Sequence, residues 1–164
     1  MFGFSFGLSS EALVMKADKL MRLEVVTVPP DLPLEAAHRL MLRRGVRHLP
    51  VVSGRRLAGI VSDRDVLLAS GRLKSGTFVY PNLSVGEVMA LSPISADPDT
   101  PITEIAKTMV LSKIDCVPII VGRNELVGLV TSTDLVLLLT EMPSEAQPAL
   151  TFQIRRAGDL ETEA

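Results

Sequence analysis

The chain contains the stretch Gly45-Val46-Arg47-His48-Leu49-Pro50-Val51-Val52, and an equivalent stretch follows about 68 residues later as Lys113-Ile114-Asp115-Cys116-Val117-Pro118-Ile119-Ile120. In each stretch an aliphatic residue and a proline lead into β-branched residues, a composition typical of a buried strand. The offset also holds for Met21 and Met89, Pro33 and Pro101, and Met41 and Met109. A repeat of this length predicts two copies of one supersecondary unit.

Each copy predicts the same element order, β-α-β-β-α. A short extended piece, at residues 25–28 and 94–96, precedes a helix whose apolar residues recur at helical spacing from Leu34 and from Ile102. In the second copy Thr100 is the expected N-cap, with Pro101 at the first helical position; in the first copy Leu32 holds the cap slot. Two strands with a Gly-containing turn follow, at residues 50–52 and 57–61 and at residues 118–121 and 126–130. A closing helix then begins near Asp63 or Ser132.

The pattern predicts a mixed α/β fold in which the two units pack with their sheets face to face. One unit alone has too small a core to be stable, and pairing covers its apolar face. The expected organisation is an extension at residues 1–14, a first repeat at 15–70, a surface connector at 71–84, a second repeat at 85–142 and a tail at 143–164 with a strand near 150–154.

Composition narrows the class of function. The 164 residues are 47% hydrophobic and 22% charged with a net charge of −2, which is ordinary for a globular protein and gives no field for binding duplex nucleic acid. The single cysteine allows no internal disulfide and no cysteine-based metal cluster, and it fits a cytoplasmic location. Residues 1–14 lack the basic start and long apolar run of a secretory signal, and no membrane insertion is expected.

Two equivalent junctions between a strand and a helix carry the chemistry. The segments Gly59-Ile60-Val61-Ser62-Asp63-Arg64-Asp65 and Gly128-Leu129-Val130-Thr131-Ser132-Thr133-Asp134 each place a carboxylate three residues after a hydroxyl. Residues three apart on a first helical turn share one face, so hydroxyl and carboxylate can converge on a ligand. A carboxylate that accepts hydrogen bonds from vicinal hydroxyls is a common way to hold a ribose. The alternative is a simple capping box, the favoured reading of any single match.

The span from Asp18 to Leu139 resembles a tandem pair of cystathionine β-synthase (CBS) domains, the Bateman module. The resemblance rests on Arg47-His48-Leu49-Pro50-Val51-Val52, on the two Gly-x-x-Ser/Thr-x-x-Asp segments, and on the openings with Met21 and Met89. It implies a pseudo-twofold pair of β-α-β-β-α units with two clefts between them for AMP, ADP, ATP or S-adenosylmethionine. It also implies a disc-shaped homodimer and regulation of an enzyme or transporter. A pair of this size is similar to stand-alone prokaryotic modules, including those of the acetoin-utilisation type.

The resemblance also implies roles for individual residues. Asp65 and Asp134 would hold ribose hydroxyls, and Ser62 and Thr131 would contact ribose or phosphate. The adenine would lie against Val28, Leu49 and Pro50 in one copy and Ala96, Val117 and Pro118 in the other. Arg47, His48 and Arg64 face the phosphate in the first copy, where the second has Asp115, Cys116 and Thr133. Because Asp115 would repel a phosphate, we expect one good phosphate-bearing site and a weaker second one.

Several residues have simpler explanations. His48 is as readily a structural hydrogen-bonding residue as a phosphate ligand, and His38 is expected to be exposed or half-buried scaffold because it has no ligating partner. Cys116 is expected to be a small buried hydrophobe. No nucleophile with an adjacent base, paired-His motif or phosphate-binding Gly-rich loop is present in the sequence, which argues against an enzyme and a required cofactor. The alternative to a ligand sensor is a dimerisation module with unused clefts.

Overall fold

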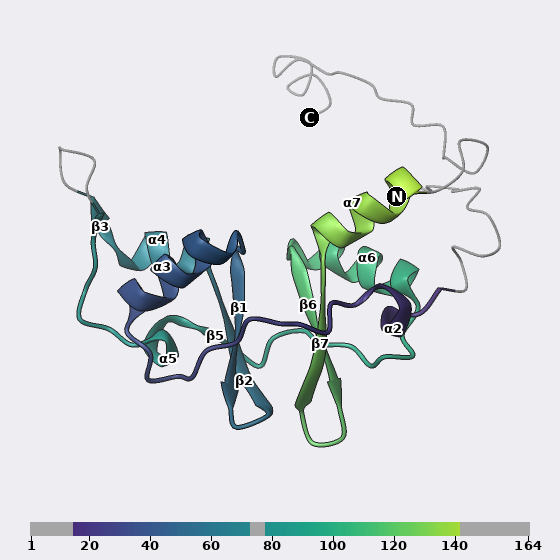
Figure 1. Cartoon of the computed structure of the whole chain (residues 1–164), viewed down its shortest axis with the longest axis horizontal. Coiled ribbons are helices and arrows are strands. Elements are labelled where there is room, and N and C mark those ends of the chain that lie inside the picture. The colour runs from purple at the N-terminus through teal and green to yellow at the C-terminus, as the bar shows by residue number, and fades with distance from the viewer. Residues whose placement is uncertain (1–14, 73–77, 142–164) are drawn as a thin grey trace, which may run out of the picture.

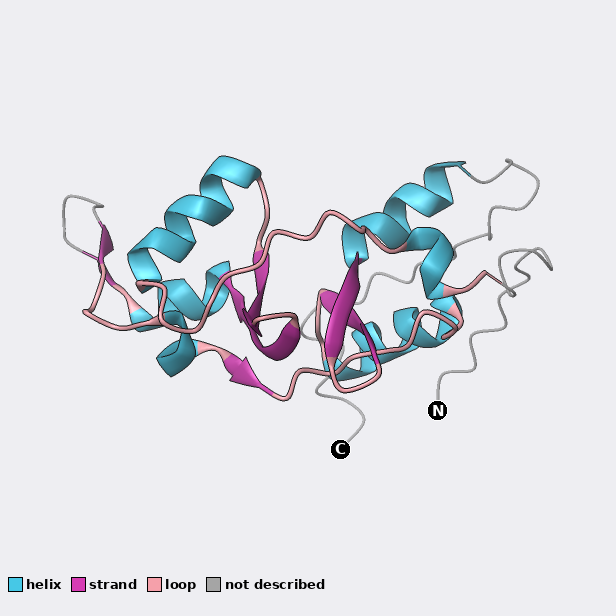
Figure 2. Ribbon diagram, turned by 60° about the horizontal axis from the view of Figure 1, so that its bottom comes forward, coloured by secondary structure: helices cyan, strands magenta, loops and turns pink. Residues whose placement is uncertain are grey.

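The computed structural model describes residues 15–72 and 78–141, and the extension at 1–14 and the tail with its expected strand at 150–154 lie outside these residues. Two β-hairpins occupy the centre of the molecule, and helices flank them on both outer sides (Figures 1 and 2). The chain therefore forms one mixed α/β body built from two similar halves.

The two halves contain the predicted elements in the predicted order. The first has helix α3 (Leu34–Arg44), strands β1 (His48–Ser53) and β2 (Arg56–Ser62), and helix α4 (Asp63–Ala69). The second has α6 (Ile102–Ser112), β6 (Cys116–Val121), β7 (Glu125–Thr131) and α7 (Ser132–Glu141). The two hairpins also share a bulge at the same place, between Val51 and Val52 and between Ile119 and Ile120. The expected repeat of a mixed α/β unit is confirmed.

The four long strands form one sheet in the order β1-β2-β7-β6. The two hairpins meet at their tips, where Arg56 pairs with Glu125, and this is the single register pair between β2 and β7. The two predicted extended pieces add one parallel bridge each, from Val28 to Val51 and from Ala96 to Ile119. A narrow junction of this kind lets each hairpin keep its own helices and its own core.

The segments that open the two repeats are exchanged between the halves. Helix α2 (Ala17–Leu20) opens the first repeat but packs beside β6 and β7, whereas α5 (Val85–Val88) opens the second repeat and packs beside β1 and β2 (Figure 1). Ala17 is fully buried in the second core and Val85 is fully buried in the first. Each opening segment thus completes the hydrophobic core of the other repeat.

Backbone pairing continues the exchange beyond the two short helices. Arg22 forms a bridge with Leu129 of β7, and strand β5 (Ala90–Leu91) pairs with β2, where Ala90 lies opposite Ile60. These pairings are equivalent, because Leu129 and Ile60 each follow the glycine of the repeated segment. Residues 22 and 90 therefore hold the same place in the two halves.

The helix starts differ from the expectation by one residue. Pro33 and Pro101 are themselves the N-cap residues, and helices α3 and α6 begin at Leu34 and Ile102. Proline fits an N-cap because that position has extended φ and ψ and the proline has no N–H group to satisfy. The hydroxyl of Thr100 instead accepts a hydrogen bond from the backbone N–H of Asp97 at 3.1 Å.

The connector is more structured than a simple surface loop. Its ends form a short antiparallel pair, β3 (Gly71–Arg72) with β4 (Phe78–Val79), while residues 73–77 lie outside the described part. The next aromatic residue, Tyr80, lies 2.7 Å from Nδ1 of His38 through its hydroxyl. His38 is only 7% exposed, so the expectation of an exposed or half-buried histidine is wrong. Tyr80 from the connector covers it.

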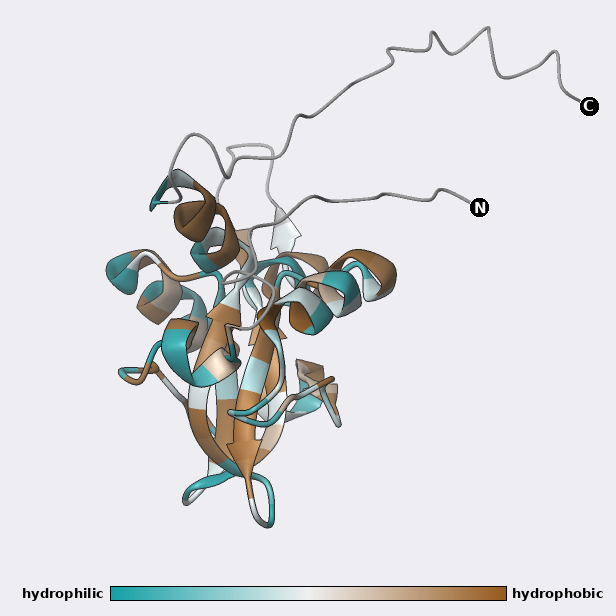
Figure 3. Ribbon diagram, turned by 90° about the vertical axis from the view of Figure 1, so that its right-hand side faces the viewer, coloured by the Kyte–Doolittle hydropathy of each residue, from teal (hydrophilic) through white to brown (hydrophobic). Residues whose placement is uncertain are grey.

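Hydrophobic residues line the strands and polar residues form the hairpin turns (Figure 3). The hydrophobic residues collect in two cores, one centred on Leu49, Val51 and Val61 and one on Val117, Ile119 and Val130. Within residues 15–72 and 78–141, no helix combines the length and apolar composition needed to span a bilayer.

Candidate functional site

Two equivalent pockets open between the repeats, each with a volume of about 360 Å³. The first, here called the Asp65 pocket, is lined by Arg47, His48, Ile60, Ser62, Asp63, Arg64, Asp65, Ala90, Leu91, Ser92, Pro93, Ile94, Lys113, Ile114, Asp115 and Cys116. The second, here called the Arg22 pocket, is lined by Arg22, Glu24, Val25, Val26, Arg44, Gly45, Val46, Arg47, His48, Asp115, Leu129, Thr131 and Thr133. Each pocket draws residues from both repeats, because the exchanged opening segments form one of its walls.

The Ser62–Asp65 junction is a capping box that leaves one carboxylate oxygen free. Oδ2 of Asp65 accepts hydrogen bonds from the backbone N–H of Ser62 at 2.8 Å and from its hydroxyl at 2.7 Å. The backbone N–H of Asp65 lies 3.2 Å from the Ser62 hydroxyl. Oδ1 of Asp65 has no partner among the described residues, and Asp65 lines the pocket. The capping reading and the ribose reading are therefore compatible, because each uses a different oxygen.

The equivalent carboxylate in the second half is fully engaged by the protein. Oδ2 of Asp134 accepts hydrogen bonds from the backbone N–H and the hydroxyl of Thr131, at 2.9 and 2.5 Å. Its Oδ1 accepts a hydrogen bond from Nε of Arg22 at 2.7 Å, a contact that joins residues 112 positions apart. Asp134 is 5% exposed and lies outside the lining of the pocket. The two equivalent aspartates thus differ in what they can offer a ligand.

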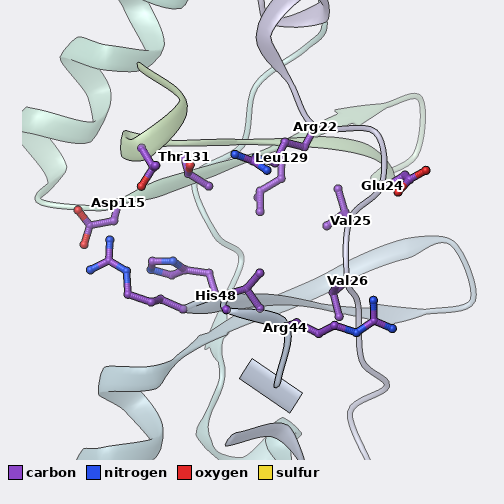
Figure 4. Close-up of a pocket in the computed structure, with 13 residues that line it drawn as sticks. Arg22, Glu24, Val25, Val26, Arg44, His48, Asp115, Leu129 and Thr131 are labelled. Atoms are coloured by element: carbon purple, nitrogen blue, oxygen red, sulfur yellow. The ribbon is translucent and has the colours of Figure 1, made fainter. Parts of the chain in front are cut away.

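Arg22 lies at the edge of its pocket, above Leu129 and Thr131, with Val25 and Val26 on the adjoining segment (Figure 4). His48 and Asp115 line the opposite side of the same pocket. The repeat match between Met21 and Met89 points to the segments that follow them, residues 22–26 and 90–94, as equivalents. Sequence reasoning missed these segments because each one belongs to one repeat in the sequence but packs against the other repeat in the structure.

Arg47, His48 and Asp115 line both pockets. The positions of Arg47 and Asp115 therefore do not distinguish the two pockets, and the expected weakening of one site by Asp115 stays a prediction. The backbone explains their position: the carbonyl of Arg47 accepts a hydrogen bond from the N–H of Asp63, and the carbonyl of Asp115 accepts one from Ser132. These bonds hold both residues at the starts of the adjacent helices, on the wall between the pockets.

The basic residues that belong to only one pocket are arranged differently in the two. The Asp65 pocket has Arg64 and Lys113, and the Arg22 pocket has Arg22 and Arg44. Arg64 is exposed and its position in the second half is taken by Thr133, as the sequence indicated. Both pockets can therefore attract an anionic group, but only in the Asp65 pocket does the aspartate of the repeated segment keep a free oxygen beside this charge.

Two titratable groups at the pockets have altered acidity. Burial lowers the pKa of His48 below 6.5, and the nearby Asp115 carboxylate partly offsets this effect. Burial, with a smaller contribution from Asp115, raises the pKa of the Cys116 thiol to about 12. His48 is therefore neutral at neutral pH, and Cys116 stays a thiol, which is unsuited to act as a nucleophile.

The residues expected to contact adenine lie deeper than expected. All six are in or beside the two cores and none lines either pocket: Val28, Leu49, Pro50, Ala96, Val117 and Pro118. The apolar walls are formed instead by Val25 and Val26 in one pocket and by Pro93 and Ile94 in the other. The bridges of Val28 and Ala96 to β1 and β6 explain the shift, because they turn these residues inward.

A model of the CBS domain family matches residues 17–72 and again residues 85–141. This chain belongs to the CBS domain family. The expected tandem CBS pair is confirmed, with one match on each repeat. The exchanged opening segments, α2 and α5, fall within the matched residues at the start of each CBS domain.

The CBS pair is similar to parts of larger proteins. The inosine-5'-monophosphate dehydrogenase of Korarchaeum cryptofilum is 36% identical to it over 122 residues, which are 74% of this chain and 24% of that enzyme. The chain thus spans about a quarter of the length of that relative, and the similarity is confined to the CBS region. The name of that enzyme therefore carries no catalytic activity over to this CBS pair.

Solved structures show the same CBS fold. A protein of Vibrio cholerae assigned to acetoin utilization is 31% identical, with a TM-score of 0.66 over 78% of this chain and 92% of that one. The CBS domain pair of protein MJ0100, in complex with 5'-methylthioadenosine and S-adenosyl-L-methionine, is 23% identical, with a TM-score of 0.67 over 77% of this chain and 97% of that one. The fold found here is therefore that of isolated CBS pairs.

Proposed function

We propose that this CBS pair is a non-catalytic regulatory module that binds one adenosyl ligand, AMP, ADP, ATP or S-adenosylmethionine, in the Asp65 pocket. The observation that carries the proposal is the free Oδ1 of Asp65, which lines a pocket of about 360 Å³ between the two repeats. A fixed carboxylate oxygen at a cleft is a suitable acceptor for the hydroxyls of a ribose. The likeness to a CBS pair that holds 5'-methylthioadenosine and S-adenosyl-L-methionine supports an adenosyl ligand.

The rest of the lining matches the other parts of such a ligand. Ile60, Pro93 and Ile94 supply an apolar wall for the adenine ring. Arg64 and Lys113 supply positive charge for a phosphate or for the carboxylate of S-adenosylmethionine. The carboxylate of Asp65 would then lie between the base and the charged end, as a ribose does in a nucleotide.

Regulation follows from the composition of the pocket. Ser62 and Asp65 belong to the first repeat, whereas Ile94 and Lys113 belong to the second, so a bound ligand contacts both halves. A ligand that contacts both halves favours the arrangement in which both sets of contacts are made, and a partner protein can read that arrangement. We expect the partner to be an enzyme or a transporter.

Isothermal titration calorimetry with AMP, ATP and S-adenosylmethionine tests ligand binding. We expect Asp65→Asn to weaken binding by about tenfold or more, because it replaces a charged acceptor with an amide, while the Ser62 cap geometry is retained. Asp99→Asn is the matched control, since it removes one carboxylate from an exposed ion pair with Lys16, far in sequence from the pocket. Asp134→Ala should weaken binding less than Asp65→Ala does. No heat with any of the three ligands would favour a dimerisation module with unused clefts.

A homodimer is also part of the proposal. Large apolar side chains are exposed on helices α3, α4, α6 and α7 of the described chain: Leu42, Leu67, Leu68, Val110, Leu111, Val136, Leu137 and Leu139. Leu111 is 82% exposed and Leu68 is 80% exposed, and side chains of this kind gain stability when a second copy covers them. Sedimentation of the wild-type protein and of Leu111→Glu tests this, and a monomeric wild type would contradict it.

A further inference from the structure

We infer that Arg22 is a specificity-determining residue that occupies the carboxylate of Asp134 and so closes the Arg22 pocket to a ribose. This inference rests on the proposed function, because it explains why one of two equivalent pockets would be open to an adenosyl ligand. The two aspartates end equivalent segments of the repeat and make the same two hydrogen bonds to the preceding hydroxyl residue, Ser62 or Thr131. Their hydrogen bonding differs in what meets Oδ1, and Asp134 is also the more buried of the two.

The residue that makes the difference belongs to the exchanged opening segment. Arg22 pairs with Leu129, and at the equivalent place Ala90 pairs with Ile60. An arginine at this place reaches the aspartate carboxylate, with Nε 2.7 Å from Oδ1 of Asp134. An alanine is too short to do so, and the Oδ1 of Asp65 is left without a partner among the described residues.

The backbone holds Arg22 where its side chain can make this contact. The N–H of Arg22 donates to the carbonyl of Leu129 at 2.9 Å, and the N–H of Leu129 donates to the carbonyl of Arg22 at 3.1 Å. The preceding residue, Met21, packs against the second core. Because the backbone of Arg22 is already held, only the side chain loses conformational freedom when the guanidinium meets Asp134.

A neutral hydroxyl cannot readily displace this guanidinium. The Arg22–Asp134 hydrogen bond joins two opposite charges, and such bonds are roughly twice as strong as those between neutral groups. The Asp134 side chain is only 6% exposed, so a ligand that removed Arg22 would leave a poorly solvated carboxylate without an opposite charge, held by its hydrogen bonds from Thr131 and by those of the ligand hydroxyls. The ribose of a nucleotide would thus have to break a better interaction than the one it forms.

A reciprocal exchange of residues 22 and 90 tests the inference by calorimetry with AMP. We expect the wild-type protein to bind one AMP per chain and Arg22→Ala to bind two, because the Oδ1 of Asp134 becomes available. In the Arg22→Ala background, Asp134→Asn should restore a single site. Ala90→Arg should place a guanidinium at Asp65 and weaken the original site by about tenfold or more. Circular dichroism of each variant checks that it is folded.

The outcomes separate this inference from the proposed function. One site in both the wild type and Arg22→Ala would overturn the inference and leave the proposed function standing. No site in the wild type but one in Arg22→Ala would support the inference and overturn the Asp65 assignment, and no site in either would overturn both. Two sites in the wild type, or a loss of sites in Arg22→Ala, would overturn the inference, since Arg22 would then bind ligand rather than exclude it. If Arg22→Ala is unfolded, Ala90→Arg decides: unchanged AMP affinity overturns the inference.

Discussion

A Cβ atom on Gly128 would lie 2.6 Å from the sulfur of Met21, which is closer than two such atoms can approach. The same relationship joins Gly59 and Met89, again at 2.6 Å. Each glycine lies on the inner strand of one repeat, β2 or β7. Each methionine ends the short helix that opens the other repeat, α2 or α5. The glycines are therefore required for the exchange of the opening segments, because only a residue without a side chain lets the crossing chain approach the strand.

This contact predicts a difference between two alanine substitutions. Gly128→Ala should lower the free energy of unfolding by about 1–3 kcal/mol, the usual cost of overpacking. The double variant with Met21→Ala should recover part of this loss, because the atoms nearest to the added Cβ belong to the Met21 side chain. Gly59→Ala should not be rescued by Met89→Ala, because the carbonyl oxygen of Ala90 also lies 2.8 Å from the added Cβ. Urea unfolding of the four variants measures both. Equal rescue in the two halves would contradict this prediction.

The half-buried His48 predicts a dependence of stability on pH. Because burial lowers its pKa below 6.5, the unfolded chain binds more protons than the folded one between 6.5 and the lowered value. The stability that depends on neutral His48 is therefore fully present above pH 6.5 and is lost as the pH falls through the lowered pKa.

The variant His48→Gln should show a flatter pH profile below 6.5 than the wild type, by at most about 1.4 kcal/mol per pH unit. Urea unfolding at a series of pH values measures the difference, and subtraction of the two curves removes the contributions that both proteins share. Parallel curves for the two proteins would show that the folded environment does not perturb His48.

The burial and the raised pKa of Cys116 predict that its thiol reacts slowly. A pKa of about 12 leaves about one thiolate per ten thousand thiols near pH 8, and the side chain is 6% exposed. A disulfide reagent should therefore label the native protein far more slowly than the protein in concentrated guanidinium chloride. Since the sequence has no second cysteine, the signal is unambiguous. Labelling at the rate of the unfolded protein would contradict the buried placement. Saturating AMP should slow labelling further, because Cys116 lines the Asp65 pocket.

The conformation and the position of Lys113 predict that this residue lowers the stability of the fold while it contributes to ligand binding. It ends α6 in the left-handed conformation, with φ of 54°, where the first repeat has Gly45 with φ of 63°. Lys113→Gly should relieve this strain and raise the free energy of unfolding by about 0.5–1 kcal/mol, and Gly45→Lys should lower it by a similar amount.

The side chain of Lys113 also lines the Asp65 pocket, so Lys113→Gly should weaken ATP binding while it stabilises the fold. Lys113→Ala separates the two effects, because it removes the charge and retains the strained conformation. If Lys113→Ala binds ATP as tightly as the wild type, the ammonium group has no part in binding.

Local interactions explain what could be predicted from the sequence. The capping boxes at Ser62 and Thr131 join residues three apart, and the hairpins and helices follow from apolar spacing within about ten residues. Because the sequence repeats, the same local structure could be predicted twice, and Asp65 and Asp134 were found as equivalent candidates. The caps of α3 and α6 were misplaced by one residue, because proline was assigned to the first helical position, which gave the cap to Thr100 in one repeat and to the less suitable Leu32 in the other.

Contacts between the repeats explain what could not be predicted. The burial of His38 depends on Tyr80 from the connector, 42 residues away, and the position of Arg47 and Asp115 on both pockets depends on how the two halves pair. The family resemblance placed the adenine wall at Val28 and Ala96, but the side to which an extended residue points depends on its bridge partner, which the sequence does not name.

The sequence by itself determined that the chain consists of two CBS units with a hydroxyl and a carboxylate at each strand-to-helix junction, because short-range spacing specifies those features. Only the tertiary structure decided which half each opening segment completes, because that depends on the packing of Met21 and Met89 against glycines in the other repeat. That exchange brings Arg22 to Asp134 across 112 residues and leaves Asp65 open. The chemical difference between two nearly identical pockets is therefore a property of the fold.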